Sequence, residues 1–354
     1  MIKINLTSKS QVYNFSKPYI IAEIGANHNG DMDLAKKMIL SAKNCGADAA
    51  KFQSWTSDSL IAKEEYERNT KYDDGDGGKK HFGSLKEMVT KYQLSTQQHF
   101  ELNEFCKKNN IQFCSTPFSI EEADLLNQLD MPFFKIASMD INNLRLLKHV
   151  AKFDKPIIIS TGMSTLEEIK LALNTIEKEG NNRIILLHCI SIYPPKNEDI
   201  NLNNITMLQQ KFVYPVGFSD HSVGTSIPLA SIALGSCIIE KHFTLDRNMP
   251  GWDHDISANP EQMKIICDES KIIQKSLGRY ERIVSKEEEI KKIRFRRSIV
   301  TRIPLKKGHV ISKDDIVFKR PATQIPPDKE ELVVGKVLKR DLPIDTLIKL
   351  SDIK

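Results

Sequence analysis

Between residues 19 and about 245, short runs of β-branched and other apolar residues alternate with longer amphipathic stretches. This alternation is typical of repeated strand–helix units around a parallel sheet. Eight runs have the composition of strands: 19–24, 47–52, 111–115, 133–137, 156–160, 184–188, 216–218 and 237–241. Eight such strands predict a (β/α)8 TIM barrel, whose usual length of about 250 residues this region matches. Ser164 followed by Glu167 predicts a capped helix start just after the fifth strand.

The pattern changes near residue 281, where a charge-dense stretch containing SKEEEIKKIRFRR begins. We interpret residues 281–297 as a helix or linker that leaves the barrel. Residues 298–354 contain short strands, proline and glycine punctuation, and a weak repeat in which 303–316 aligns with 340–353. The sequence therefore predicts a barrel domain over 1–280 and a small pseudo-symmetric domain over 298–354.

Composition limits the class of protein further. With 354 residues, of which 40% are hydrophobic, the chain can bury a full core and form a second domain. The 51 basic and 46 acidic residues are interspersed, which argues against a nucleic-acid-binding stripe. The first residues, MIKINLTSKS, lack the apolar run of a signal peptide, and no apolar run is long enough to cross a membrane. The six cysteines are scattered without a C-x-x-C pair, so we expect reduced thiols and a cytoplasmic protein.

Nearly every predicted strand ends in residues that can take part in chemistry. In a barrel of this type the strand ends converge on one face, where active sites are built. In strand order these residues are Glu23; Lys51 and Gln53; Ser115 and Thr116; Lys135 and Ser138; Ser160 and Thr161; His188 and Ser191; Ser219, Asp220 and His221; and Glu240 and His242.

Two of these residues, Lys51 and Lys135, lie inside the apolar runs ADAAKFQ and PFFKIAS. A buried lysine is unfavourable unless it meets an anion, so the pair indicates a bound phosphate or carboxylate. The alternative is that both lysines reach solvent or pair with Glu23 or Asp140.

Two histidines, His221 and His242, end the seventh and eighth strands, which are neighbours in a closed barrel. Their imidazoles would then be placed to share one divalent cation and to leave positions open for water and substrate. The nearby acids Glu240 and Asp253, the latter in GWDHD, are able to orient ligands or transfer protons. The residues alone thus indicate a barrel enzyme with an anionic substrate and a metal ion.

A set of ordered motifs resembles the sialic acid synthases of the NeuB type. They are IAEIGANHNG (21–30), AKFQ (50–53), STPF (115–118), FKIAS (134–138), ISTGM (159–163), LLHC with IYP (186–194), GFSDH (217–221) and EKHFT (240–244). The C-terminal IPLKKG and FKRP resemble the antifreeze-like SAF domain that follows the barrel in those enzymes. The resemblance covers nearly the whole chain.

The resemblance implies a reaction and residue roles. The reaction joins phosphoenolpyruvate (PEP) to an N-acylated amino sugar with C–O cleavage and phosphate release. It uses a divalent metal, for which Mn²⁺ is expected and Mg²⁺ and Co²⁺ are the alternatives. A domain-swapped homodimer is implied as well, with no nucleic acid or membrane partner. The implied roles are PEP binding by Lys51, Lys135, Ser138, Ser160 and Ser219; metal binding by His221 and His242; catalysis by Glu23 and Asp253; and sugar binding by Gln53, Asp140, Tyr193 and, across the dimer, Arg320.

Two positions depart from the neuraminate synthases that the motifs resemble. Those enzymes usually have asparagine where this chain has Ser191, and glutamate where it has Asp140. A hydroxyl does not reproduce the donor and acceptor pair of an amide. Both departures bear on the choice of amino sugar and not on the PEP chemistry. The resemblance as a whole implies the N-acetylneuraminate synthase type, with N-acetylmannosamine as the sugar, and the alternative is a legionaminic or pseudaminic acid synthase that uses a 2,4-diacetamido-trideoxyhexose.

Other readings of the same residues remain open. A related synthase for a phosphorylated sugar would also use PEP, whereas a Schiff-base aldolase would use Lys51 or Lys135 as its nucleophile without a metal. A carbohydrate-binding or ice-binding protein is suggested only by the C-terminal domain.

Overall fold

The computed structural model describes residues 2–70 and 83–354, which form two compact units, Met1–Gly278 and Arg279–Lys354. The first unit contains eight parallel strands: β3 (Tyr19–Gly25), β4 (Ala49–Ser54), β5 (Gln112–Pro117), β6 (Phe134–Ile136), β7 (Ile157–Ser160), β8 (Ile184–Cys189), β9 (Val216–Asp220) and β10 (Ile238–His242). Their order is β5-β4-β3-β10-β9-β8-β7-β6. Because β10 pairs with β3 and β5 lies beside β6, the sheet curls into a nearly closed barrel, which confirms the predicted fold.

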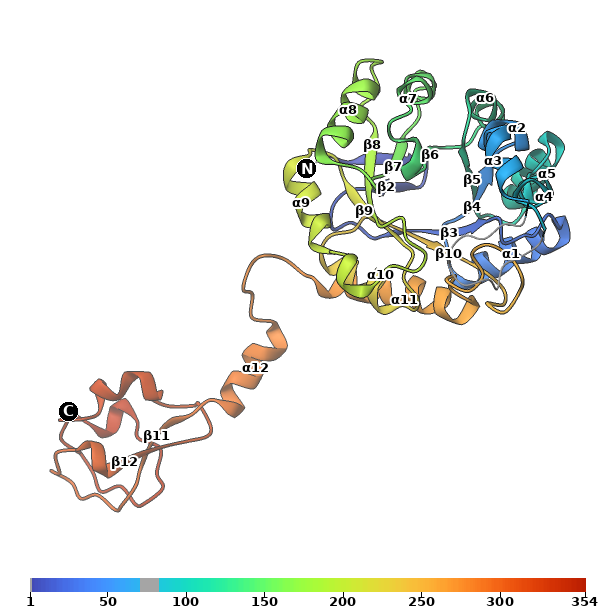
Figure 1. Cartoon of the computed structure of the whole chain (residues 1–354). Helices are drawn as coiled ribbons and strands as arrows, with labels where there is room; N and C mark the ends of the chain where they lie inside the picture. The colour runs from blue at the N-terminus through green and yellow to red at the C-terminus, as the bar shows by residue number, and fades with distance from the viewer. Residues whose placement is uncertain (1, 71–82) are drawn as a thin grey trace. The chain divides into compact units, whose positions relative to one another are not determined.

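Helices surround this barrel in the order expected from the alternation (Figure 1). They are α1 (Met32–Cys45), α2 (Ser57–Leu60), α3 (Lys63–Arg68), α4 (Leu85–Tyr92), α5 (Thr96–Lys108), α6 (Ile120–Gln128), α7 (Leu144–Ala151), α8 (Leu166–Glu177), α9 (Asn203–Lys211), α10 (Ser226–Ala233) and α11 (Pro260–Ser276). None of the described helices is long and apolar enough to span a membrane.

Local sequence explains where these helices begin and end. Helix α1 starts where Asp31 accepts hydrogen bonds from two backbone N–H groups, and it ends at Gly46, whose φ of 97° is left-handed. Helix α8 starts at Thr165, whose side chain accepts from the N–H of Glu168. The predicted cap at Ser164 was therefore wrong by one residue, because Ser164 donates instead to the Gly162 carbonyl.

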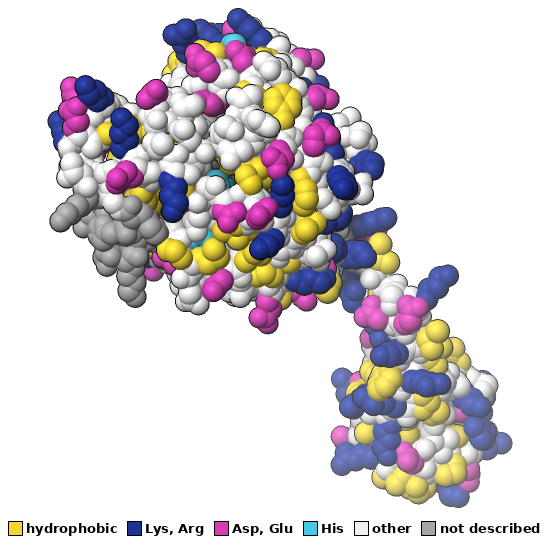
Figure 2. Space-filling view, turned by 90° about the vertical axis from the view of Figure 1, so that its right-hand side faces the viewer, with side chains coloured by type: hydrophobic (Ala, Val, Ile, Leu, Met, Phe, Trp, Pro, Cys, Tyr) yellow, Lys and Arg dark blue, Asp and Glu magenta, His cyan; other side chains and the backbone are white. Residues whose placement is uncertain are grey.

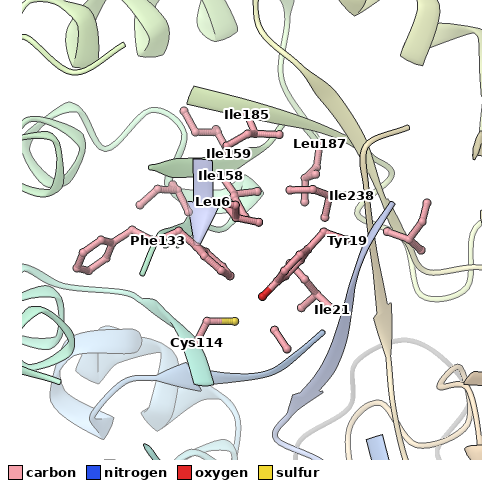
Figure 3. Close-up of a cluster of buried hydrophobic side chains, with 14 of the residues drawn as sticks. Leu6, Tyr19, Ile21, Cys114, Phe133, Ile158, Ile159, Ile185, Leu187 and Ile238 are labelled. Carbon is pink, nitrogen blue, oxygen red and sulfur yellow. The ribbon is translucent and has the colours of Figure 1, made fainter. Parts of the chain in front are cut away.

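Inward side chains change character along each strand, because successive side chains point to opposite sides of the sheet. On β3 the apolar Ile21 is followed two residues later by Glu23, and on β10 Ile238 is followed by Glu240 and His242. The apolar members form one buried cluster with Tyr19, Phe133 and Ile158, among others (Figure 3). The barrel is thus filled by apolar residues at the strand starts and by polar residues at the strand ends.

An N-terminal hairpin that the sequence analysis did not predict contributes to this core. Strands β1 (Ile4–Thr7) and β2 (Ser10–Val12) pair antiparallel, and Leu6 lies in the same buried cluster as Tyr19 and Phe133 (Figure 3). The hairpin therefore covers the end of the barrel opposite to the charged strand ends.

The second unit contains helix α12 (Lys286–Phe295) and the antiparallel strands β11 (Ser298–Thr301) and β12 (Ile316–Lys319). The predicted repeat has a structural counterpart: Leu305 and Leu342 exchange two backbone hydrogen bonds of 2.8 Å. Each half also ends in a short 3-10 helix, Lys313–Asp315 and Leu350–Asp352.

The two units differ in charge. Residues 279–354 contain 20 basic and 12 acidic residues, whereas the rest of the chain contains 31 and 34. Both signs of charge are thus present in each unit, as the interspersed pattern predicted, and the excess of basic residues lies in the second unit.

Candidate active site

A cavity of about 300 Å³ opens at the C-terminal ends of the barrel strands. Ten of the thirteen predicted site residues line it: Glu23, Lys51, Gln53, Lys135, Ser138, Ser160, Tyr193, Ser219, His221 and His242. Figure 2 shows histidine atoms in a hollow of the barrel domain, with hydrophobic side chains around them. The strand-end pattern thus brought together residues that lie up to 219 positions apart in sequence.

The floor of the cavity carries an alternating set of buried charges. Lys51 Nζ lies 2.7 Å from Glu23 Oε2 and 3.7 Å from Glu240 Oε2, and Lys135 Nζ lies 3.5 Å from Glu240 Oε1. None of these four side chains is more than 7% exposed. Both lysines therefore contact carboxylates, as the alternative interpretation allowed, but the shared partner is Glu240 and not Asp140.

Neutral groups complete the hydrogen bonds of this charged floor. Gln53 Nε2 donates to Glu23 Oε1 at 2.8 Å, Ser219 Oγ donates to Glu240 Oε1 at 2.9 Å, and Lys51 Nζ donates to Thr116 Oγ1 at 3.1 Å. The buried hydroxyl of Ser160 has no hydrogen-bond partner within the described residues. A free hydroxyl that lines the same cavity as two lysines is suited to an anionic oxygen of a ligand.

The two carboxylates have opposite pKa shifts. Burial raises the pKa of Glu23 to about 7, more than Lys51 lowers it. Glu240 is also buried, but Lys135 and Lys51 outweigh this effect and hold its pKa below the usual value. For Lys51, burial is outweighed by Glu23 and Glu240, which raise its pKa. Lys51 therefore stays protonated, which disfavours it as the nucleophile of a Schiff-base aldolase.

The two predicted metal ligands face the same side of the cavity. The ring centroids of His221 and His242 lie 5.4 Å apart, and the ring of Tyr193 stacks on His221 at 4.1 Å. His221 Nδ1 lies 2.7 Å from the Ile190 carbonyl, an acceptor only, so Nδ1 carries a proton and the neutral ring keeps its lone pair on Nε2. Burial lowers the pKa of His221, but Cys189 and the Ile190 carbonyl outweigh burial and raise this pKa, so a cation would compete with a proton for Nε2.

These histidines fit a divalent cation by their chemistry. Burial and the neighbouring His221 hold the pKa of His242 well below its usual value, so its imidazole is neutral, the form that binds a metal. Its Nδ1 is buried, lacks a hydrogen bond in the described part of the chain, and lies 3.7 Å from Asp253 Oδ2. Residues 2–70 and 83–354 hold no cluster of three or more metal-binding side chains, so a cation here would rest on two imidazoles.

Three predicted residues do not line the cavity. Asp140 ends the 3-10 helix Ser138–Asp140 and accepts a hydrogen bond of 3.2 Å from Asn143. Asp253 lies behind His242, as described above. Arg320 belongs to the second unit, where its guanidinium stacks at 4.9 Å on the ring of Phe295.

The cavity also contains residues outside the thirteen that were assigned a role from the sequence. Phe118, Met139 and Met163 form an apolar part of its wall, and Ser191 and Thr116 add hydroxyls. Phe118, Met139 and Met163 each lie within three residues of a predicted strand-end residue, so the position signal was present. What was missing was a chemical reason to select apolar residues.

Comparison with known proteins places the chain in a family. The model of the NeuB family matches residues 38–282, and that of the SAF domain matches residues 296–354. The chain belongs to the NeuB family.

Among relatives in the NeuB family, the N,N'-diacetyllegionaminic acid synthase of Campylobacter jejuni is 43% identical over 94% of this chain and 99% of its own length. The enzyme of the same name from Legionella pneumophila is 38% identical, with 93% of both chains covered. The crystal structure of an N-acetylneuraminic acid synthetase from Leptospira borgpetersenii, solved with citrate, is 34% identical with a TM-score of 0.71, and the match covers 82% of this chain and 95% of that one. These three relatives are synthases of legionaminic or N-acetylneuraminic acid.

Proposed function

We propose that this protein is an enzyme that condenses PEP with the open-chain form of an N-acylated amino sugar to give a nine-carbon acid and inorganic phosphate. The observation that carries the proposal is the pair of buried lysines, Lys51 and Lys135, on the wall of one cavity. The same wall carries the imidazoles of His221 and His242. The free thiols of all six cysteines and the names of the relatives support a cytoplasmic biosynthetic enzyme.

In this reaction the methylene carbon of PEP forms a bond to the aldehyde carbon of the sugar, and the aldehyde oxygen takes up a proton. Water then adds to C2 of the PEP unit and loses a proton, and the C2–O bond breaks as phosphate leaves. Lys51 and Lys135, with the hydroxyls of Ser138, Ser160 and Ser219, would bind the phosphate and carboxylate of PEP. Both lysines are already held by Glu23 and Glu240, so PEP meets a positioned pair.

Glu23 is the group that we propose to take the proton of the attacking water. Its pKa of about 7 suits a base that must be ionised before the reaction and protonated after it. Its anionic form also stabilises positive charge that develops at C2. Asp253, behind His242, is the second proposed proton-transfer group.

His221 and His242 are the residues that would hold a divalent cation, with Mn²⁺ proposed before Mg²⁺ or Co²⁺. When bound, the cation supplies a Lewis acid for the sugar aldehyde. Asp253 Oδ2 lies 3.7 Å from His242 Nδ1 and would orient this imidazole if the two atoms moved to hydrogen-bond distance on metal binding.

For the sugar we now favour a 2,4-diacetamido-trideoxyhexose over N-acetylmannosamine. The apolar wall of Phe118, Met139 and Met163 suits the methyl group of a 6-deoxy sugar better than a hydroxymethyl group, and the legionaminic acid synthases among the relatives support the same class. Gln53, Asp140, Tyr193 and Arg320 remain the proposed sugar contacts, of which Gln53 and Tyr193 line the cavity.

Phosphate release from PEP tests this proposal. In the presence of Mn²⁺ we expect kcat/KM for a 2,4-diacetamido-trideoxyhexose to exceed that for N-acetylmannosamine by about 10-fold or more, the usual effect of one misplaced polar group. Release should stop on chelation and return when the metal is restored. If no sugar of either class supports release, the proposed reaction is wrong; if N-acetylmannosamine is preferred, only the sugar assignment is wrong.

We also propose that Arg320 reaches the sugar in the active site of a second copy of the chain. The net charges of the units, −3 for residues 1–278 and +8 for residues 279–354, support attraction between unlike units, and Ile290, Ile293 and Phe295 are exposed on α12.

A mixture of Arg320→Ala and Glu23→Ala, each inactive alone, should therefore recover about one quarter of wild-type activity after subunit exchange. Random exchange makes half of the dimers mixed, and each mixed dimer has one intact site. A mixture that exchanges subunits but stays inactive would show that Arg320 does not act across the dimer.

A further inference from the structure

A buried ion pair joins the ends of β9 and β10 on the side that faces away from the cavity. Lys241 Nζ lies 2.7 Å from Asp220 Oδ2, and the two side chains are 0% and 1% exposed. The residues are direct neighbours on adjacent strands. Because side chains alternate along a strand, Ser219, His221, Glu240 and His242 face the cavity while this pair lies behind them.

The ion pair also fixes the backbone on both sides of His221. Asp220 Oδ1 accepts a hydrogen bond of 2.9 Å from the N–H of Ser222, and the Lys241 ammonium donates to the carbonyl of the same serine. His221 lies between Asp220 and Ser222, and its ring is held separately by the Ile190 carbonyl. His242 follows Lys241 directly in β10. One pair of side chains thus controls the backbone that carries both histidines.

Stability alone gives little reason for this arrangement. Two buried charges lose their hydration, and apolar residues of similar volume generally stabilise a core as well or better. Both side chains lie in the layer between the sheet and the surrounding helices, where the other strands mostly carry aliphatic residues. Groups behind metal ligands, by contrast, commonly fix the orientation of those ligands and influence metal affinity strongly.

We propose that Asp220 and Lys241 are positioning residues that hold His221 and His242 at the separation required to share one divalent cation. The inference rests on the proposed metal-dependent function. It assigns to the ion pair a role in metal affinity that differs from PEP binding by Lys51 and Lys135, which are carried by β4 and β6. Of the proposed PEP contacts, Ser219 alone lies on β9 beside Asp220.

The double variant Asp220→Asn/Lys241→Met tests this role. Asparagine keeps the acceptor for the Ser222 N–H, and methionine keeps most of the lysine chain length without the charge. We expect the Mn²⁺ dissociation constant, measured by titration calorimetry, to rise about 10- to 100-fold. The PEP dissociation constant should change by a smaller factor than the Mn²⁺ dissociation constant, because both lysines of the PEP site are untouched and only Ser219 of its contacts lies on β9.

Three further variants separate the possible outcomes. His221→Ala should abolish Mn²⁺ binding, which locates the site. Leu146→Ala on α7 removes a buried side chain away from β9 and β10, so it should lower the melting temperature while Mn²⁺ affinity stays unchanged. Asp220→Asn alone retains Lys241 and should give an intermediate affinity, which keeps the test valid if the double variant does not fold.

A double variant that binds Mn²⁺ as tightly as the wild type, while His221→Ala does not bind, would overturn the positioning role and leave the proposed function intact. A loss of affinity no larger than that of an equally destabilised Leu146→Ala would overturn it as well. A wild-type protein that takes up no Mn²⁺ would instead remove the metal from the proposed function, and this inference with it.

Discussion

Replacement of Lys51 by methionine is expected to lower kcat/KM for PEP by about 10²- to 10³-fold, the effect of removing one preorganised charged donor. Lys51 contacts Glu23 at 2.7 Å, Glu240 at 3.7 Å and Thr116 at 3.1 Å, so it is the cation that joins the two carboxylates of the cavity floor. Without it, Glu23 and Glu240 repel each other and the incoming anion. Initial rates at several PEP concentrations, with the sugar saturating, measure the effect.

A surface ion pair provides the matched control for Lys51→Met. Lys36 pairs with Glu101, but these side chains are 29% and 45% exposed. Lys36→Met should change kcat/KM less than about twofold, because exposed pairs contribute at most about 1 kcal/mol. Lys51→Met should in addition destabilise the barrel by about 3–5 kcal/mol, since it leaves buried carboxylates without their cation. Unchanged PEP kinetics in a folded Lys51→Met protein would contradict the assignment of this lysine to the PEP site.

Acidification is expected to destabilise the barrel through buried neutral histidines. Burial lowers the pKa of His28 to about 4, and it lowers the pKa of His99 and His188 in the same direction. An unfolded chain protonates these groups near pH 6.5 whereas the folded chain does not, so stability falls as the pH falls from about 6.5 towards 4. His28 alone accounts for about 2 kcal/mol between pH 8 and pH 5, at 1.36 kcal/mol per unit of pKa shift.

Urea unfolding of the wild type and of His28→Asn at both pH values measures this contribution. In the wild type the Gly30 N–H donates a hydrogen bond of 3.1 Å to His28 Nδ1, and the side-chain oxygen of asparagine retains an acceptor for it. The difference in unfolding free energy at pH 8 measures the pH-independent effect of the substitution, which is then subtracted. Glu23 acts in the opposite direction, because its raised pKa makes the folded state take up a proton on acidification. The difference between the two proteins cancels that contribution. If the wild type and His28→Asn lost the same unfolding free energy between pH 8 and pH 5, His28 would not be buried as a neutral group.

The sequence by itself determined the barrel and most of the residues at its open end. Strand periodicity is local, so the alternation around Ile21 and Glu23 could be read without knowing what lies beside them. Once eight strands are assigned, barrel closure places all their C-terminal ends on one face, whatever the loops do. This is why Lys51, Lys135 and the two histidines, taken from strand ends that are distant in the chain, line one cavity.

The tertiary structure decided which of these residues contact one another. Glu240 was identified as a strand-end acid, but only the packing of four strands, β4, β6, β9 and β10, makes it the shared partner of both lysines and Ser219. Asp140 fell outside the cavity wall because the short helix Ser138–Asp140 turns the chain after Ser138. The N-terminal hairpin escaped notice because three- and four-residue strands carry too little periodicity to read.

The ion pair of Asp220 and Lys241 shows most clearly which properties the sequence determines and which only the tertiary structure decides. The sequence places each residue directly before a histidine at a strand end. The sequence predicts that these two strands are neighbours, but it does not state that Asp220 and Lys241 stand in matching register, that the charges are fully buried, or that both bind Ser222. Periodicity along one strand is a local property of the chain, whereas a contact between strands depends on the closed sheet, and for that reason only the folded barrel reveals it.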